Sequence, residues 1–311
     1  MKKIFVMAAM VLGVSAAYAG DSEPLKAITK SKTYAEAEAL LNSTLDQLAS
    51  PQEKAKAYNK LYELSIKDFE TVSAVIAENQ KAAVMKTDQK AYDTASYYNS
   101  AYNAVKAAVE CDKYDGQPDA KGKVKIAYRK DEVRLQKLMQ ARLELVNAGQ
   151  WIDGKNDESG LLKYWGLFLN SRNTSLFEKL PKEPFLGQVA FYAGAYAERA
   201  GQLEQADKYF DIAMQDPEWA EKAQNAKFEV AGKNLKTQAD TLRYIGQLKE
   251  LYTQKNSEVA FSVLCKLYSS SNMTKDLNAL VEDMLKKNPK NFLALAYHTQ
   301  AVADSVSRQE E

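Results

Sequence analysis

Apolar residues recur every three or four positions along most of the chain, which is the spacing of one face of an α-helix. In the first half, this pattern runs over 34–48, 58–76 and 92–109. Alanine, leucine, lysine, glutamate and glutamine are abundant, and all five are strong helix formers. The seven prolines stand where an apolar period stops, so none of them would break a helix. The pattern predicts an all-α protein with three or four helices in residues 21–115.

Two helix starts are marked by side chains that can cap the first turn. Thr33 stands three residues before Glu36, and Ser50 stands three residues before Glu53, which is the spacing of a capping box. Pro51 strengthens the second signal, because proline is favoured at the first helical position. Helices are therefore expected to begin directly after Thr33 and directly after Ser50.

A short segment rich in glycine, proline and aspartate interrupts the helical pattern at 115–122. Such a mixture is typical of a loop. The loop predicts a division of the chain into an N-terminal helical region, 20–115, and a second helical region, 124–305. A further irregular stretch with two prolines follows at 170–184.

The second region contains a helical pair that occurs twice in the same register. In 187–218, small residues mark the first helix, a glycine marks the turn, and alanine and phenylalanine stand four residues apart in the second helix. The residues of this unit are Ala190, Ala193, Gly194, Ala197, Gly201, Ala206, Phe210, Ala213 and Pro217. In 258–290 the corresponding residues are Phe261, Leu264, Cys265, Tyr268, Asn272, Leu277, Val281, Met284 and Pro289.

Less regular pairs surround these two units. Residues 134–171 and 219–257 show the same order of features with stretched spacing, and 292–305 has the pattern of one more first helix. In 258–290, Leu277 stands where a small alanine is expected, so the close contact between the two helices of this pair fits the pattern less well.

The pattern of 187–218 and 258–290 resembles the tetratricopeptide repeat (TPR) family, whose unit is W-x2-L-G-x2-Y, then A-x3-F, then P, over about 34 residues. More specifically, it resembles the loosely patterned TPR proteins of bacterial envelopes. The resemblance covers about 134–305 and, more weakly, 33–110. It implies an α-solenoid of helical hairpins, with a concave groove lined mostly by the first helix of each pair. An irregular α-bundle that contains helical hairpins is the alternative.

A groove of this kind implies a non-catalytic adaptor or scaffold that binds a peptide or helix of a partner protein. The resemblance places the groove-facing candidates at Gln188, Phe191, Ala195 and Glu198 in one unit and at Val259, Ser262, Lys266 and Ser269 in the other. Some TPR domains hold a peptide's C-terminal carboxylate with lysine and asparagine at these positions. Phe191 and Ala195 cannot form such a clamp, so an apolar or aromatic contact is expected instead.

The N-terminus has the features of an export signal. Lys2 and Lys3 precede an uncharged apolar run at 4–17, and Ala17-Tyr18-Ala19 forms a cleavage site before Gly20. A buried helix or a membrane anchor is the alternative, but the run is short for a membrane span. We therefore expect a signal peptide over 1–19, cleaved after Ala19, and a location in the bacterial periplasm or outside the cell. No cysteine follows the cleavage site to carry a lipid.

Charge and motif content exclude several functions. The chain has 42 basic and 41 acidic residues, and without Lys2 and Lys3 its net charge is about −1, whereas nucleic-acid binding needs a basic surface. His298 is the single histidine, so neither a histidine-based metal site nor a catalytic triad can be built. No phosphate-binding glycine motif is present. No cofactor, metal or enzymatic activity is expected.

Glu158-Ser159 has the letters of a motif found in some lytic transglycosylases. The other motifs of that class do not follow it, and Glu158 stands in a polar insertion that is unsuited to a general acid. Cys111 and Cys265 are expected to be small buried residues, although an oxidising compartment would also permit a disulfide.

A carbohydrate- or cell-wall-binding helical protein is the alternative function. Such proteins stack aromatic rings on sugars, and Trp151, Trp165 and Trp219 are the candidates. Trp165 and Trp219 stand at packing positions of the repeats, which favours a role in the core.

Overall fold

The computed structural model describes residues 20–155, 157–181 and 183–307, with side chains to residue 303. The expected signal peptide, residues 1–19, lies outside the described residues. Thirteen α-helices and one short 3-10 helix occur in the described parts, and no strand is present there, which confirms the all-α class. The helices are α1 (Glu23–Lys30), α2 (Tyr34–Thr44), η1 (Leu45–Gln47), α3 (Pro51–Met85), α4 (Thr94–Asp115), α5 (Glu132–Asp153), α6 (Glu158–Ser171), α7 (Leu186–Arg199), α8 (Leu203–Ala213), α9 (Ala220–Lys233), α10 (Gln238–Lys255), α11 (Glu258–Ser270), α12 (Thr274–Lys287) and α13 (Phe292–Ser307).

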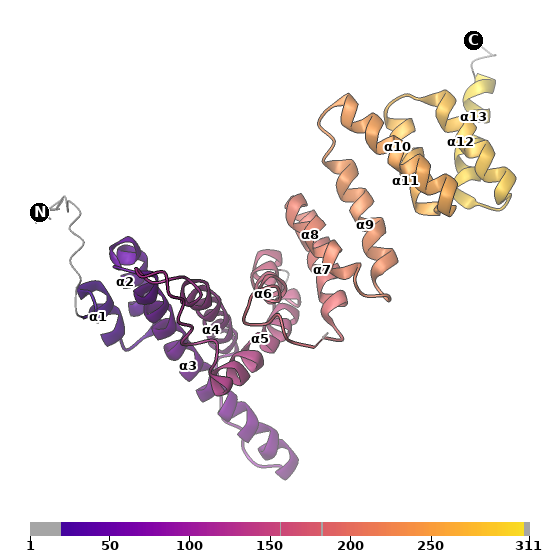
Figure 1. The fold of residues 1–311 in the computed structure, drawn as a ribbon. Helices are drawn as coiled ribbons and strands as arrows, with labels where there is room; N and C mark the ends of the chain where they lie inside the picture. The colour runs from indigo at the N-terminus through magenta and orange to yellow at the C-terminus, as the bar shows by residue number, and fades with distance from the viewer. Residues whose placement is uncertain (1–19, 156, 182, 308–311) are drawn as a thin grey trace, which may run out of the picture. The chain divides into compact units, whose positions relative to one another are not determined.

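The chain divides into two compact units, and Figure 1 shows the helices of each. The first unit runs to Trp151 and includes Asn170–Leu180, and the second comprises Ile152–Leu169 and the residues from Pro181 onward. The division therefore falls near the end of α5, and the predicted 115–122 loop lies inside the first unit.

Hydrogen bonds to buried aspartates of α4 hold residues 127–129, which follow this loop. The Asp115 carboxylate accepts the backbone amides of Ala127 at 3.0 Å and Tyr128 at 2.9 Å. Arg129 Nε donates to the carboxylate of the buried Asp112 at 2.6 Å. The segment that leads into α5 is thus bound to the helix before the loop, which explains why the first unit continues beyond residue 122.

The two predicted helix starts are confirmed. The side-chain hydroxyls of Thr33 and Ser50 accept the backbone amides of Glu36 and Glu53, at 3.3 and 3.2 Å. Glu53 has a second role that its capping position does not indicate. Its carboxylate accepts the backbone amide and the hydroxyl of Ser22, each at 2.7 Å, and so joins the start of α1 to α3.

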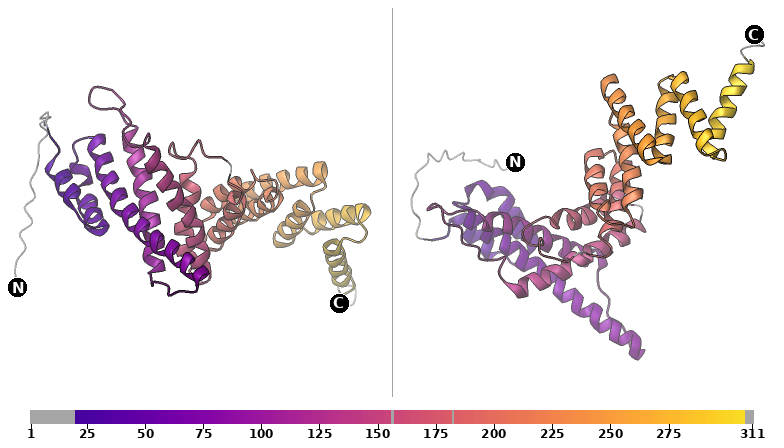
Figure 2. Two further views of the ribbon diagram at one scale, coloured as in Figure 1. Left: turned by 90° about the horizontal axis from the view of Figure 1, so that it is seen from below. Right: turned by 45° about the vertical axis from the view of Figure 1, so that its right-hand side comes forward.

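The last turns of α3 project beyond its neighbours in the first unit (Figures 1 and 2). Val84 and Met85 near its end are 84% and 72% exposed. The chain returns along this projection, where the Asn79 side chain both donates to and accepts from the backbone of Lys90, each at 2.7 Å. The projection is therefore an ordered hairpin that exposes single apolar side chains.

In the second unit, successive helices pack against one another as pairs. Contacts join α7 to α8, α8 to α9, α10 to α11, α11 to α12 and α12 to α13. The helix α9 also contacts both α7 and α11, so first helices of neighbouring pairs touch. The pairs around α11 share a buried apolar core, formed by Tyr244, Ile245, Leu248, Tyr252, Ala260, Phe261, Val263, Leu264, Cys265, Tyr268, Val281, Met284 and Ala294.

The turns after α7 and after α11 share a left-handed backbone conformation. Gly201 has φ of 73° and Asn272 has φ of 55°, both in the left-handed region. Glycine and asparagine are the residues that adopt this conformation most readily, and it is common directly after a helix. Both positions are assigned to turns by the sequence pattern, and the structure confirms this.

The hydrogen bonds of these two turns also correspond. The amide of Gln202 donates to the carbonyl of Ala197 at 2.8 Å, and the amide of Met273 donates to the carbonyl of Tyr268 at 2.8 Å. In each turn the left-handed residue itself donates to a carbonyl three positions earlier. The same helix ending thus recurs 71 positions later, counted from residue 201 to residue 272. It also ends α3 in the first unit, where Lys86 is left-handed and the amide of Thr87 donates to the carbonyl of Ala82, so the ending by itself does not define a repeat.

The helices α7 and α8 approach closely at Gly194. A Cβ atom at this position would lie 2.6 Å from Cε1 of Phe210, whose side chain is fully buried. The corresponding positions of the later pair are Cys265 and Val281, which are both buried in the core around α11. In both helical pairs, a small buried residue of the first helix and a larger buried residue of the second helix stand at corresponding positions.

Cys111 and Cys265 are free and fully buried. Burial raises the pKa of each thiol to about 12, so little of the reactive thiolate forms at pH 8. We expect both thiols to resist iodoacetamide at pH 8 in the native protein and to react quickly after unfolding in urea. Mass spectrometry of the alkylated protein measures this, and rapid alkylation of either thiol in the native protein would contradict the burial described.

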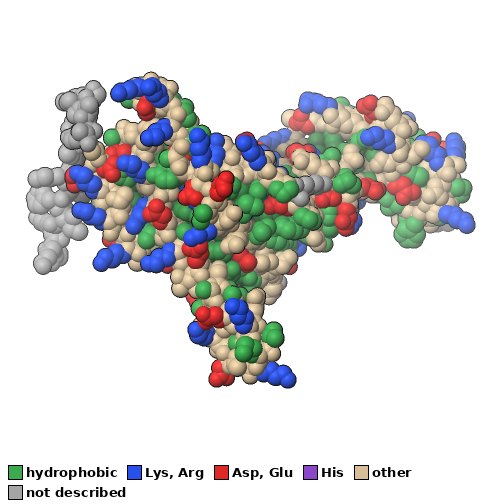
Figure 3. Space-filling model, turned by 60° about the horizontal axis from the view of Figure 1, so that its bottom comes forward, with side chains coloured by type: hydrophobic (Ala, Val, Ile, Leu, Met, Phe, Trp, Pro, Cys, Tyr) green, Lys and Arg blue, Asp and Glu red, His purple; other side chains and the backbone are tan. Residues whose placement is uncertain are grey.

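Charged side chains of both signs are interspersed over the face shown in Figure 3. This agrees with the near-neutral balance of 42 basic and 41 acidic residues in the whole chain. Among the described helices, none combines the length and apolar character that a membrane crossing requires.

Candidate binding surface

The four candidates on α7 differ in what they present to solvent. Gln188 is exposed, whereas Phe191, Ala195 and Glu198 are half-buried. The spacing of these residues places them along one side of α7, as the repeat register requires. Gln188 is the exposed member of this set, so the accessible part of this side of α7 is polar, whereas the sequence predicts an apolar or aromatic contact there.

Phe191 belongs to an aromatic cluster that joins three segments. Its ring centroid lies 5.2 Å from that of Trp219, 5.6 Å from Tyr192 and 5.9 Å from Phe210. Trp219 and Phe210 are buried, while Tyr192 is 42% exposed. Phe191 therefore has a packing role, and Tyr192 is the member of the cluster that a partner can reach.

Glu198 pairs with a lysine of the next helical pair. The Lys233 Nζ atom lies 2.8 Å from the Glu198 carboxylate, whose side chain is 12% exposed. This pair links the end of α7 to the end of α9 and raises the pKa of Lys233, mainly through the hydrogen bond. The two residues are 35 positions apart, close to one repeat period. Lys233 is not among the residues singled out from the sequence, although opposite charges one repeat apart could have indicated the pair.

The candidates on α11 present a polar surface. Lys266 and Ser269 are exposed, and Val259 and Ser262 are half-buried. Because α9 contacts both α7 and α11, the two sets of candidates lie on helices that share one neighbour.

Two of the three tryptophans are buried and cannot stack on a sugar. Trp165 and Trp219 are 6% and 8% exposed, in agreement with the packing role expected for them. Trp165 contacts the edge of Tyr196 at 6.3 Å, and Trp219 also contacts the half-exposed Tyr192 at 5.5 Å. Trp151, in the first unit, is half-buried against Tyr98 at 5.5 Å.

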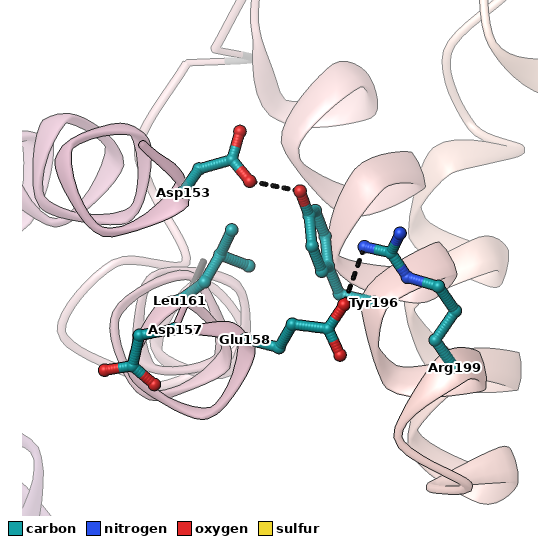
Figure 4. A pocket seen from close by; sticks show the side chains of 6 residues that line it. All are labelled: Asp153, Asp157, Glu158, Leu161, Tyr196 and Arg199. Carbon is teal, nitrogen blue, oxygen red and sulfur yellow. Dashed lines mark hydrogen bonds and ion pairs between the residues drawn. The ribbon is translucent and has the colours of Figure 1, made fainter. Parts of the chain in front are cut away.

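A small polar pocket of about 180 Å³ lies beside α7 (Figure 4). It is lined by Asp153, Asp157, Glu158, Leu161, Tyr196 and Arg199. The Tyr196 hydroxyl donates to the Asp153 carboxylate, and this bond is the main reason why the pKa of Tyr196 is raised. The Nη2 atom of Arg199 lies 3.1 Å from Oε1 of Glu158, and the Cζ atom of Arg199 lies 4.2 Å from the Tyr196 ring centroid.

The surroundings of Glu158 do not suit catalysis of glycoside cleavage. A general acid for this reaction needs a carboxyl group kept protonated, which burial in an apolar site provides. The Glu158 side chain is 45% exposed and forms an ion pair with Arg199, so it does not lie in an apolar site of this kind. Asp157 has a local structural role, because its carboxylate accepts the amide of Gly160 in the first turn of α6.

The described residues contain no group of three or more His, Cys, Asp or Glu side chains placed to hold a metal ion. His298, on α13, is exposed, in agreement with the surface or packing role that a lone histidine suggests. The candidate surface therefore offers contacts for recognition, and within the described residues we identify no arrangement for covalent or metal-assisted chemistry.

Comparisons with known proteins do not assign this chain to a family. No protein family model matches it, and no curated protein matches it at a significant level.

Proposed function

We propose that the second unit is a TPR-like array whose first helices bind a segment of another protein. In this proposal, the chain is a non-catalytic adaptor or scaffold in the bacterial periplasm or outside the cell, exported by a signal peptide cleaved after Ala19. The observation that carries it is the recurrence of buried packing residues in one register, with Gly194 and Phe210 in α7 and α8 and Cys265 and Val281 in α11 and α12. A recurring local structure at a fixed register is what a repeat architecture requires.

The packing between helices supports the same proposal. Gly194 and Cys265 stand at equivalent positions, and each is a small buried residue of a first helix. The contacts of α9 with α7 and α11 bring successive first helices together, and in TPR-like arrays these helices form the inner face. The exposed residues Gln188, Tyr192 and Lys266 then make this face a mixed polar and aromatic surface.

Site-specific photo-crosslinking tests this proposal. A benzophenone side chain is placed at Gln188 or Lys266 on the proposed face, and at Lys208 of α8 or Lys275 of α12 as matched controls on second helices. Crosslinking is performed in the source cells, and crosslinked proteins are identified by mass spectrometry. We expect one defined protein to crosslink from the two face positions at least about tenfold more than from the controls, as a contact confined to one face requires.

Equal labelling from all four positions, or none from the face, would contradict a groove on these first helices. Phe191 is unsuitable for the test because its ring packs on buried residues. The carbohydrate alternative has its own readout. A shift in tryptophan fluorescence with cell-wall fragments, together with the absence of a crosslinked protein, would favour glycan binding.

A further inference from the structure

An open cavity of about 430 Å³ in the first unit is lined by residues of α2, α3 and α4. Its lining includes one aromatic ring, Tyr34, and one charged side chain, Asp68. Apart from Val72, the other described side chains of the lining carry hydroxyl or amide groups. Cavities for small organic ligands are mostly apolar, so this lining suits a ligand that itself carries many polar groups.

The lining residues of α4 form a polar stripe along one side of the helix. They occur at positions i, i+3, i+4 and i+7, which is the spacing of a single helix face. On a helix that packs against a neighbour, this spacing is normally held by apolar residues. The members of the stripe are Ser96, Asn99, Ser100 and Asn103.

The middle of α3 contributes a second polar stripe to the same cavity. Its residues Ser65, Asp68 and Thr71 follow one another at intervals of three positions. Serine, threonine and asparagine form helices less readily than alanine, because their side chains compete for backbone hydrogen bonds. Helix formation therefore does not explain why such residues gather on two adjoining helices around one cavity.

The hydroxyls that a ligand can reach belong to Thr71 and Ser96, which are exposed, whereas Ser65 and Ser100 are buried. Thr71 donates to the carbonyl four residues earlier at 2.8 Å, and Ser96 donates to the Asp93 carboxylate at 2.6 Å. Each hydroxyl oxygen retains lone pairs that can accept a further hydrogen bond. Both groups can therefore accept hydrogen bonds from donors of a ligand.

Two further groups of the lining are available for recognition. Asp68 is exposed and Asn103 is half-buried. Among the described residues, no hydrogen bond or ion pair engages either side chain. A carboxylate can accept from two donors at once, and an amide both donates and accepts. Neighbouring hydroxyl groups of a sugar ring provide the matching set, because each of them donates one hydrogen bond and accepts others.

Tyr34 adds an aromatic surface to this polar lining. Its side chain is half-buried, and its hydroxyl donates to the Glu38 carboxylate at 2.8 Å. Glu38 also lies 3.5 Å from Lys106 of α4, so the tyrosine is held between two helices by a small network. An aromatic ring of this kind can pack on the C–H groups of a sugar ring, while the polar groups bind its hydroxyls.

The charges of the lining discriminate between classes of polar ligand. A phosphate or carboxylate would meet Asp68 without a lysine or arginine in the described lining to balance it. An ammonium ion would pair with Asp68, but it would leave the hydroxyl and amide groups of α4 unused. A neutral ligand with several hydroxyl groups uses the carboxylate, the amides and the hydroxyls together.

We propose that this cavity binds a neutral saccharide, with its hydroxyl groups held by Asp68 and Asn103 and its C–H groups packed on Tyr34. The site uses none of the three tryptophans. It lies in the first unit and is independent of the function proposed for the second unit, so the crosslinking test and the test below can fail separately.

An array of immobilised neutral oligosaccharides, built from hexoses and N-acetylhexosamines, provides the probes for residues 20–311. We expect the array to retain the chain on a defined oligosaccharide, which in free form should bind in calorimetric titration with a Kd of about 1 mM or tighter. Raising NaCl from about 0.05 M to about 0.5 M should leave this binding unchanged, because salt screens only charged partners. Tetramethylammonium, as the cationic probe, should not compete.

Variants then locate the binding. Asp68→Asn keeps the shape of the side chain but removes the charged acceptor, so it should weaken binding about tenfold or more. Thr71→Trp should fill the cavity and abolish binding. Asp88→Asn is the matched control, because Asp88 is also exposed but does not line the cavity, and it should leave binding unchanged. Asp68 and Thr71 are both exposed, so the variants should keep the circular dichroism of the unmodified chain.

Three results would overturn the proposal. The first is an array that retains the chain on no oligosaccharide. The second is binding to Asp68→Asn or to Thr71→Trp that is as tight as binding to the unmodified chain, or that Asp88→Asn weakens equally. The third is competition by tetramethylammonium together with loss of binding at high salt, which would assign the cavity to cations.

Discussion

Replacing Gly194 with tryptophan should lower the free energy of unfolding of the second unit by more than about 3 kcal/mol, the upper part of the usual range for overpacking. Even a Cβ at this position would lie 2.6 Å from Cε1 and 2.8 Å from Cδ1 of Phe210. Phe210 is fully buried, so its ring has no open space into which it can move. The helices α7 and α8 would have to separate, and most of their mutual contact would be lost.

Replacing Gly194 with alanine tests this contact more sharply, because the contact alone decides whether the substitution raises or lowers the free energy of unfolding. In a helix interior, Gly→Ala normally stabilises by about 1 kcal/mol. A Cβ atom added at Gly246 of α10 would meet no heavy atom within 4 Å, so Gly246→Ala should raise the free energy of unfolding by about 1 kcal/mol. Gly194→Ala should lower it, because the strain against Phe210 exceeds the gain in helix propensity.

Urea unfolding followed by far-UV circular dichroism measures both changes. The two units can unfold in separate transitions, so each transition is fitted on its own. Phe210→Leu removes ring atoms from the contact, and in the Gly194→Ala background it should cost less than it does alone. If both alanine variants raise the midpoint equally, α7 and α8 do not meet at Gly194.

The contact at Gly194 could be predicted from the sequence because its causes are local and repeat. Small residues at one helical spacing, a glycine at the turn and a phenylalanine at a fixed distance are all visible within 187–218. The same holds for the helix starts at Thr33 and Ser50, where the donor and acceptor lie three residues apart. In each case, the interacting residues are close in sequence, so a periodic pattern that includes both of them can predict the interaction.

Interactions between distant segments were not predictable in this way. The repeat register placed Phe191 on the groove face, but it gave no sign that Trp219, beyond the next helix, would pack on its ring. The first unit continues to Trp151, and Asp115 binds residues twelve and thirteen positions later within it, whereas composition alone favoured a boundary at 115–122.

Arg134 shows the same limit in the first unit. Its tyrosine neighbour Tyr62 is 72 positions earlier in the chain, and no motif joins the two.

Glu53→Ala should lower the free energy of unfolding of the first unit by about 3 kcal/mol, because removing a buried carboxylate that accepts several hydrogen bonds would leave its donors unpaired. The Glu53 side chain is 8% exposed and accepts three bonds from outside its own helix. These come from the amide and hydroxyl of Ser22, at 2.7 Å each, and from the amide of Ala49 at 2.8 Å.

Glu53→Gln should also be destabilising, although glutamine has the same shape. One carboxylate oxygen of Glu53 accepts the Ser22 amide, and the other accepts the Ser22 hydroxyl and the Ala49 amide. Whichever way the glutamine amide is turned, its NH2 group therefore faces a backbone donor. An acceptor is needed at both positions, and only the carboxylate provides two.

The matched control is Glu36→Gln, at the equivalent position of the other capping box. Glu36 is exposed, and its carboxylate accepts the amide of Lys32 at 3.0 Å, so water can replace this bond and the change should stay below about 1 kcal/mol. Hydrogen exchange gives the local readout, because Ser22 caps α1 and Glu53 fixes its position. In Glu53→Gln, the amides of α1 should exchange faster while those of α4 change only with the global stability. Unchanged exchange in α1 would show that the buried Leu25 and Ile28, rather than Glu53, hold this helix in place.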